Sequence, residues 1–251
     1  MTRQRLLLPL VGITLFVGAW GAAVLLTGTR LVPGPVAVAR ALVELLAHGL
    51  LLRYVVASLF RVTWGFLLAA ALAIPAGIAL GLSRRGEAAA NPLVQVLRPI
   101  SPLAWIPVAI LWFGVGDLAA VYLIFVASFF SLLVTVIRAV RDVDPVHRNA
   151  ARNSGLDRRR MVTRVLLPAI LPQLIVGLRL ALGVAWLVVV AAEMIAVNSG
   201  LGFLIVDARN AGNRYDLVVA GMVMIGATGL CLDLLVRRLE RLPNVSWGFS
   251  S

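Results

Sequence analysis

The chain has 251 residues, of which 61% are apolar, and its mean hydropathy is +0.98. This apolar share lies above the roughly one half of soluble globular domains, and several apolar runs reach the roughly 20 residues that a helix needs to cross a bilayer. A soluble globular protein is therefore excluded. The formal net charge is +12, but no basic patch alternates with stacking aromatic rings, which argues against a nucleic-acid-binding surface.

The composition predicts an all-α, polytopic membrane protein with about six transmembrane helices. All basic residues other than histidine are arginines, and most lie between the apolar runs, in residues 3–5, 84–85, 138–164 and 237–241. By the positive-inside rule these segments, and both termini with them, are expected in the cytoplasm. The one cysteine, Cys231, can form no internal disulfide, and no Cys/His spacing predicts a metal site.

The first predicted span is Leu6–Thr27. It is too long for the 7–15-residue apolar region of a signal peptide and lacks a small-residue cleavage site, so we expect it to stay uncleaved. The segment Val36–Leu46 follows a Gly/Pro-rich turn and predicts a short helix with Leu42, Leu45 and Leu46 on one face. This helix either lies on the outer membrane surface or simply connects two spans.

The second predicted span runs from about Tyr54 to Leu82. Arg61 lies near its outer part, where we expect the long side chain to extend to the membrane interface. The third predicted span, Leu93–Phe113, contains Pro99, Pro102 and Pro107. Proline removes a backbone donor and clashes with the preceding helical turn, so this span is expected to be kinked or partly unwound.

The remaining spans are expected at Leu118–Val140, Leu166–Ala196 and Asp216–Val236. An outer loop from Asn198 to Arg214 is expected to join the last two of them. No internal repeat, inverted or parallel, of the kind common in secondary transporters is visible in the sequence.

The longest polar interval is Asn149–Pro168, before the fifth predicted span. Asp144 and Pro145 predict a helix start, because proline fits the first helical position, and Gly155 predicts its end, because glycine readily adopts the left-handed conformation there. Asp157 can cap a second short helix that carries several arginines and leads into the span. We therefore expect an elbow of two short helices at the cytoplasmic face.

The elbow resembles the EAA loop of permease subunits of ATP-binding-cassette (ABC) importers. The residues at the spacing of that motif are Ala150, Ala151, Gly155, Val165, Leu167 and Pro168. Asn149 stands where the family usually has glutamate. The resemblance implies that the elbow couples to the ATPase, through Arg148, Asn149, Ala150, Ala151, Arg152, Gly155, Leu167 and Pro168. Small side chains would let the first helix fit closely into a groove, and arginines one turn apart suit carboxylates on the partner.

Further segments are similar to the nitrate, sulfonate, taurine and bicarbonate branch of these permeases. They are Leu97–Pro107, Gly177–Leu180, Ala191–Met194 and Ser199–Gly202. This resemblance implies a type I ABC importer permease fold and import of a small anion in the bacterial inner (plasma) membrane. It also implies a second permease copy, with a homodimer favoured over a pair with a close relative, cytoplasmic ABC ATPase subunits, and an external substrate-binding protein or lipoprotein.

On this interpretation the chain divides into three parts. Residues 1–53 hold the first span and the outer segment, residues 54–242 form the permease core with a cytoplasmic coupling loop at about 141–165, and residues 243–251 form a cytoplasmic tail.

The sequence contains no Gly-x-x-x-x-Gly-Lys-Ser/Thr motif and no lysine at all, so it predicts neither an enzyme nor a cofactor in this chain. ATP and Mg are expected to bind to the partner ATPase. A secondary transporter or channel that works without an ATPase is the alternative function. An intramembrane enzyme is a more remote one, because neither Ser101 nor Ser128 has a base nearby in the sequence.

Charged side chains inside spans are costly, so each requires a role. Arg98, Arg179 and Glu193 are the candidates for the substrate pathway. Arg179 either stabilises a passing anion or pairs with a carboxylate such as Asp233. Arg98 alternatively has a snorkelling or packing role. Glu193 either lies near an outer gate or makes a structural hydrogen bond.

Overall fold

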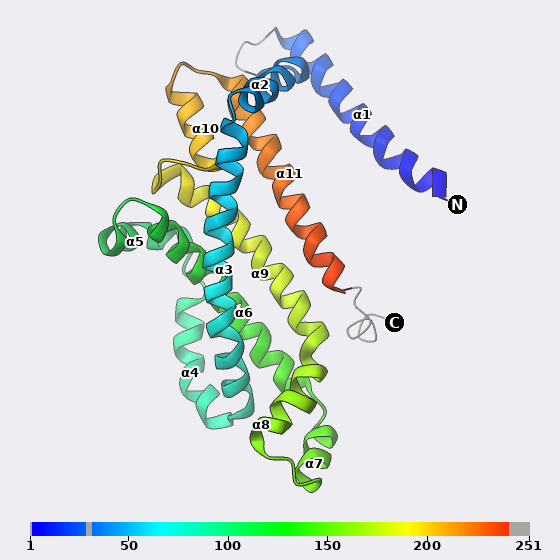
Figure 1. Ribbon diagram of the computed structural model, residues 1–251, viewed down its shortest axis with the longest axis vertical. Coiled ribbons are helices and arrows are strands. Elements are labelled where there is room, and N and C mark those ends of the chain that lie inside the picture. The colour runs from blue at the N-terminus through cyan, green and yellow to red at the C-terminus, as the bar shows by residue number, and fades with distance from the viewer. Residues whose placement is uncertain (1, 29–31, 241–251) are drawn as a thin grey trace.

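The structure is a computed structural model that describes residues 2–28 and 32–240. All secondary structure in this part of the chain is helical (Figure 1). The α-helices are α1 (Thr2–Thr27), α2 (Pro35–Ala47), α3 (Leu50–Leu82), α4 (Arg84–Leu97), α5 (Ile106–Phe113), α6 (Asp117–Asp142), α7 (Pro145–Asn153), α8 (Arg158–Met161), α9 (Leu167–Ile195), α10 (Leu201–Asn210) and α11 (Tyr215–Glu240). A 3-10 turn, η1 (Pro102–Trp105), precedes α5, and a π-helical turn, η2 (Val162–Leu166), precedes α9. The predicted tail, residues 243–251, lies outside the described residues.

Among the described residues, α1, α3, α6, α9 and α11 are long and apolar enough to cross a membrane. Helix α4 and the η1–α5 segment would together make a sixth span, although they meet at an angle of 85°. The predicted all-α, polytopic class is confirmed, and so is the break in the third predicted span. The helix begins before the expected span start at Leu93: α4 starts at Arg84, where the Ser83 hydroxyl accepts a hydrogen bond from the Gly86 N–H (3.0 Å).

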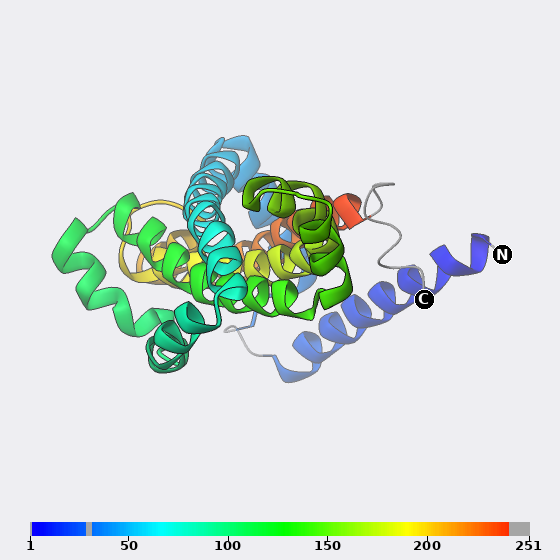
Figure 2. The same ribbon diagram turned by 90° about the horizontal axis from the view of Figure 1, so that it is seen from below.

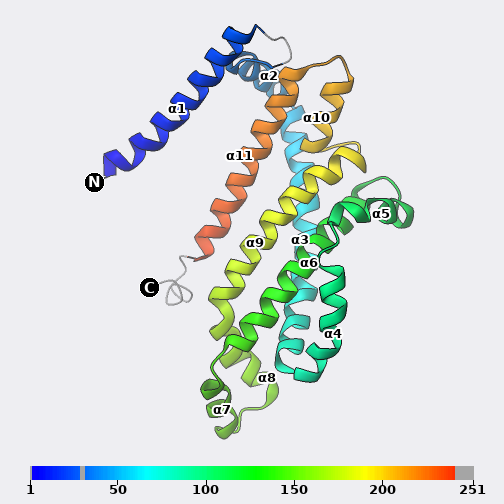
Figure 3. The same ribbon diagram turned by 180° about the vertical axis from the view of Figure 1, so that it is seen from behind.

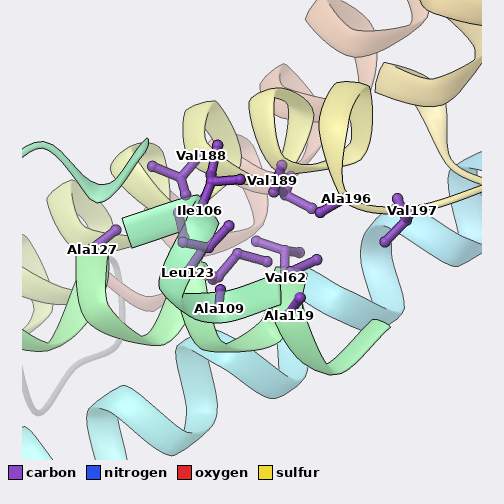
Figure 4. Close-up of a cluster of buried hydrophobic side chains, with 14 of the residues drawn as sticks. Val62, Ile106, Ala109, Ala119, Leu123, Ala127, Val188, Val189, Ala196 and Val197 are labelled. Carbon is purple, nitrogen blue, oxygen red and sulfur yellow. The ribbon is translucent and has the colours of Figure 1, made fainter. Parts of the chain in front are cut away.

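Helices α3, α6 and α9 form the centre of the bundle. Helix α3 runs in the same direction as α6, and α9 packs against both in the opposite direction (Figure 1). Apolar side chains fill the space among the three. In one of the two clusters Val62 of α3, Leu123 of α6 and Val189 of α9 gather with residues of α5 (Figure 4). The second cluster extends this core toward α7 and α8.

A stripe of small residues lets α3 approach α6 closely. These residues recur at every fourth position and are all buried: Gly65, Ala69, Ala73, Gly77 and Gly81. A Cβ added to Gly77 would lie 2.7 Å from the Val136 Cβ of α6, and one added to Gly81 would lie 2.7 Å from the Val140 Cβ. Residues four apart share one helix face, and small residues there allow two backbones to pack closely inside a membrane. We refer to this set as the small-residue stripe.

Two apolar helices, α1 and α5, project from the bundle on opposite sides (Figures 1, 2 and 3). None of the residues of α1 between Leu10 and Thr27 is buried. Leu111 and Trp112 of α5 are 81% and 62% exposed. Apolar surfaces of this extent need lipid or another protein around them, which agrees with a membrane-embedded chain.

Helix α2 packs across the end of the bundle opposite α7 and α8 (Figure 1). The predicted helix is confirmed, and its leucine face is only partly buried within the chain. Its buried residues are Val38, Ala41 and Leu45, whereas Leu46 is 59% exposed. The reason is the neighbouring helix: α11 packs against α2, and Ala41 of α2 and Ala220 of α11 belong to the same buried cluster.

An ion pair outside the apolar cluster also holds α2 against the start of α11. The Arg214 guanidinium, just before α11, lies 2.7 Å from Glu44 of α2 and 2.9 Å from Asp216. Its hydrogen bond holds the pKa of the Glu44 carboxyl below the ordinary value, and the two carboxylates, Asp216 foremost, raise the pKa of Arg214. Glu44 therefore links α2 to the start of α11 through Arg214.

Candidate functional site

The elbow adopts the predicted form. The Asp144 carboxylate accepts a hydrogen bond from the Val146 N–H (2.8 Å), and Pro145 is the first residue of α7. The helix ends at Gly155, whose φ is +71°, and the Leu156 N–H donates to the Ala151 carbonyl (3.2 Å). A left-handed glycine followed by this bond is a common way to satisfy the last carbonyls of a helix.

The second arm of the elbow leads into α9 without a break. The Asp157 carboxylate accepts a hydrogen bond from the Arg160 N–H (3.2 Å), which caps α8 as predicted. The π-helical turn η2 joins α8 to Leu167 and Pro168 at the start of α9. Leu166 of that turn is buried in the core between α6 and α9. A displacement of the elbow would therefore act on a span that belongs to the centre of the bundle.

The residues predicted for ATPase coupling face different ways. Asn149, Ala150 and Gly155 are exposed on the surface of the elbow, whereas Ala151 is only 5% exposed. Arg148 and Arg152 belong to α7, but their side chains lie outside the described part of the structure. In the η2–α9 arm, Leu167 is half-buried and Pro168 is exposed. Ala151 thus packs inward, and the surface that a partner could reach here includes Asn149 and Ala150.

A charged cluster joins α3, α6 and α9 near the end of the bundle that carries α10. The Arg61 guanidinium contacts Glu193 and Asp117, each at 2.7 Å, and also donates to the backbone carbonyl of Ser199 (2.7 Å). The exposed fraction of the side chain is 2% for Arg61 and zero for Glu193, while Asp117 reaches the surface at 58%. A buried carboxylate is compatible with folding only when it is paired in this way.

The same carboxylate holds the start of α10. One oxygen of Glu193 accepts the hydrogen bond from Arg61 (2.7 Å), and the other accepts from the Ser58 hydroxyl and the Gly202 N–H, both at 2.9 Å. The Leu201 N–H in turn donates to the Ser58 hydroxyl (3.0 Å). The first N–H groups of a helix have no partner within the helix and favour a negative charge. The expected outer loop from Asn198 to Arg214 therefore contains a helix anchored by Glu193.

Arg61 is the residue that sequence reasoning placed wrongly. The expected snorkelling does not occur, because Glu193 and Asp117 offer carboxylates inside the bundle. Ser58 and Arg61 lie three residues apart, so they share a face of α3. Opposite charges in two otherwise apolar spans were the available signal, but sequence alone did not show which spans are neighbours. Of the two predicted roles of Glu193, the structural hydrogen bond is the one that matches the observed contacts.

The contacts of Arg179 also match one of its two predicted roles. The Arg179 Nε lies 2.6 Å from the Asp233 Oδ1 of α11, and a second nitrogen lies 3.2 Å from Oδ2. Asp233 further pairs with Arg237 at 2.8 Å. The two side chains are about one third exposed, 29% for Arg179 and 33% for Asp233. This two-point contact links α9 to α11.

We expect Arg179→Gln to lower the melting temperature of the purified protein, because Asp233 loses a two-point partner but keeps Arg237. Thermal denaturation in detergent measures the change. Asp233→Asn should restore part of the loss, since it removes the remaining charge. Arg237→Gln is the matched control and should have a smaller effect. An unchanged melting temperature for Arg179→Gln, combined with lost transport, would instead assign Arg179 to the pathway.

Arg98 borders a hollow between α4 and α6. It is exposed and follows the last residue of α4. The hollow has a volume of about 630 Å³. Its polar lining comes from Glu87, Asn91, Gln95 and Arg98 on the α4 side and from Arg138 on α6. Arg98, Arg179 and Glu193 are thus not brought together in one site.

Comparison with known proteins gives a family match, several relatives and a similar solved fold. Residues 73–244 match the family described as binding-protein-dependent transport system inner membrane component. A putative ABC transporter permease of Methanocaldococcus jannaschii is 41% identical over 197 residues, which is 78% of this chain and 73% of that protein. The bicarbonate transport system permease CmpB of Synechococcus elongatus is 37% identical over 254 residues, covering 95% and 91% of the two chains. The putative aliphatic sulfonates permease SsuC of Bacillus subtilis is 36% identical over 238 residues, covering 95% and 85%.

The fold is also similar to that of a solved ABC importer. The inward-facing MetNI methionine ABC transporter aligns with a TM-score of 0.62 at 20% identity, covering 76% of this chain and 97% of that one. This likeness confirms the predicted type I permease fold.

Proposed function

The chain belongs to the family of binding-protein-dependent transport system inner membrane components, and from this premise we propose that it imports a small oxyanion and receives ATPase motion through the elbow. As a member of that family it is a multi-pass inner-membrane permease subunit of an ABC importer and is not itself catalytic. It works with an ATPase and a substrate-binding protein.

The orientation and assembly belong to the proposal. Both termini and the elbow lie in the cytoplasm, and the end of the bundle with α2 and α10 faces outward, because the arginines of the elbow and of α4 follow the positive-inside rule. Two copies of this chain form the pathway with two ATPase subunits, which bind ATP and Mg. The exposed apolar side chains of α1 and α5 support a second permease copy, since no other part of residues 2–28 and 32–240 covers them.

The substrate class rests on the relatives and on the charge of the chain. Two of the relatives are named for bicarbonate and for aliphatic sulfonates, both oxyanions. Arg98 and Arg138 line the hollow between α4 and α6, and a guanidinium binds the oxygens of such anions through paired hydrogen bonds. The proposal therefore favours a small oxyanion, in the range of nitrate, bicarbonate, taurine and sulfonates.

One observation carries the coupling role: the elbow continues through η2 directly into α9, with Leu166 buried in the core. Gly155 sets the angle between the two arms through its φ of +71°. The exposed Asn149 and Ala150 of α7 offer a small, uncharged contact surface where the family usually has glutamate.

Reconstitution in vesicles with the cognate ATPase and binding protein tests this function. We expect ATP-dependent uptake of at least one anion from a panel of nitrate, bicarbonate, taurine and ethanesulfonate. Gly155→Val should reduce uptake by about tenfold, because a side chain costs about 1–2 kcal/mol in the left-handed conformation. ATPase docking, measured by co-purification, should weaken in parallel.

Gly49→Val is the matched control, because Gly49 has a similar φ of +68° but lies between α2 and α3. It should strain the backbone equally without affecting docking. Normal uptake by Gly155→Val would show that the elbow does not couple to the ATPase. Uptake driven by an ion gradient in the absence of ATP would contradict the importer function as a whole.

A further inference from the structure

The hollow between α4 and α6 is lined by one face of each helix. On the α4 side, Glu87, Asn91, Gln95 and Arg98 recur at intervals of three or four residues. On α6, Ile137 and Arg138 lie three and four residues after Val134. Residues with this spacing form a continuous stripe along a helix. The hollow is therefore a groove between a polar stripe on α4 and a mostly apolar stripe that ends in a guanidinium.

The charges in this groove do not cancel. Glu87 forms an ion pair with Arg141, so its negative charge is already compensated. The guanidinium groups of Arg98 and Arg138 have no ion-pair or hydrogen-bond partner within residues 2–28 and 32–240. This leaves two positive charges beside two neutral amides, Asn91 and Gln95.

Arg98 connects this groove with a second, smaller hollow. That hollow measures about 190 Å³ and lies where the chain breaks between α4 and η1, against Ser131 of α6 and Val184 of α9. Arg98 lines both hollows. A small anion in either hollow would therefore contact the Arg98 guanidinium.

We propose that the groove is a binding site for a small oxyanion, with Arg98 and Arg138 as its charged ligands and Asn91 and Gln95 as neutral donors. The inference rests on the proposed function. It gives the transported anion a binding position in the half of the bundle nearer the elbow. Both guanidinium groups are exposed where they line the groove, and a bound oxyanion would supply a counter-charge and acceptor oxygens together.

Arg138 was interpreted from the sequence only as one of the arginines that orient the chain in the membrane. In the structure it also lines the groove. It lies one helical turn before Arg141, which is engaged by Glu87. The Glu87–Arg141 pair neutralises the carboxylate of the groove lining, so the net charge of the lining comes from Arg98 and Arg138. A cation would meet net repulsion at this position.

The probe is sodium ethanesulfonate, with sodium bicarbonate in parallel, titrated into the purified permease in detergent at constant ionic strength. The anion-dependent rise in melting temperature gives the apparent affinity. We expect Arg98→Gln and Arg138→Gln each to weaken binding by about tenfold, since each removes one charge-assisted contact. Arg138→Lys should weaken binding less, because it keeps the charge but loses the planar fork.

Arg85→Gln is the matched control: Arg85 is exposed on α4 but does not line the groove. It should bind the anions as the wild type does. Anion-free melting temperatures of all variants identify any that are misfolded. Wild-type affinity in both Arg98→Gln and Arg138→Gln would overturn the site.

The same variants in vesicles separate this inference from the proposed function. ATP-dependent uptake that persists with both glutamine variants, without any loss of anion affinity, would refute the groove and leave the importer intact. Arginine-dependent anion binding without any ATP-dependent uptake by the wild type would support the groove and contradict the proposed function.

Discussion

Replacing Arg61 with methionine is expected to lower the folding stability by about 3–5 kcal/mol, because it leaves the Glu193 carboxylate buried without its charged partner. Glu193 is fully buried and would keep only the neutral donors Ser58 and Gly202. The start of α10 depends on the same carboxylate, so the loss should extend to the contact between α9 and α10. Thermal denaturation of the purified protein in detergent, together with its yield from membranes, measures the effect.

Arg53→Met is the matched control, since Arg53 lies on the same helix but is exposed. It should change stability little. The double variant Arg61→Met/Glu193→Gln should regain part of the loss, because it no longer buries an unpaired charge. A wild-type melting temperature for Arg61→Met would show that the buried pair contributes nothing to the fold.

Replacing Gly77 with leucine is expected to separate α3 from α6 and to cost about 3 kcal/mol or more, the upper end for overpacking a core. Even a single added Cβ would lie 2.7 Å from both Val136 Cβ and Cγ1, closer than carbon atoms can approach. Thermal denaturation again gives the magnitude.

Ala79→Leu is the control for this change, because Ala79 lies two residues away on the exposed side of α3. It should leave the melting temperature nearly unchanged. A smaller pair tests the contact itself: Gly77→Ala should destabilise the protein, and Val136→Ala in the same chain should relieve the clash. Equal stability of Gly77→Leu and Ala79→Leu would contradict the close packing of α3 on α6.

The elbow was predictable because its signals are local. Asp144, Pro145 and Gly155 specify a helix start and end through their own backbone preferences, and the structure confirms both. Its role at the ATPase stays a prediction, since it depends on a partner chain. The small-residue stripe is also a local feature of the sequence, with a small residue at every fourth position of α3. It indicates a close helix contact but does not show which helix makes it.

The charged residues show where local reasoning ends. Arg179 could be matched to Asp233 as one of two alternatives, and the structure places the two side chains in contact. Arg61 could not be matched to Glu193, because the two residues are 132 positions apart and any of several spans could have been the neighbour. The groove at Arg98 was equally hidden, because it needs α6 beside α4 to bring Arg138 near.

The sequence by itself determined the membrane class, the approximate spans, the break at the prolines and the form of the elbow. Each depends on hydropathy over one segment or on backbone preferences of adjacent residues, which the chain carries wherever it lies. Only the tertiary structure decided that α3 packs against α6 and α9, that Glu193 holds Arg61 and α10, and that two arginines share a groove. Those contacts join residues far apart in the chain, and their free energy depends on which side chains the packed helices leave within reach of one another.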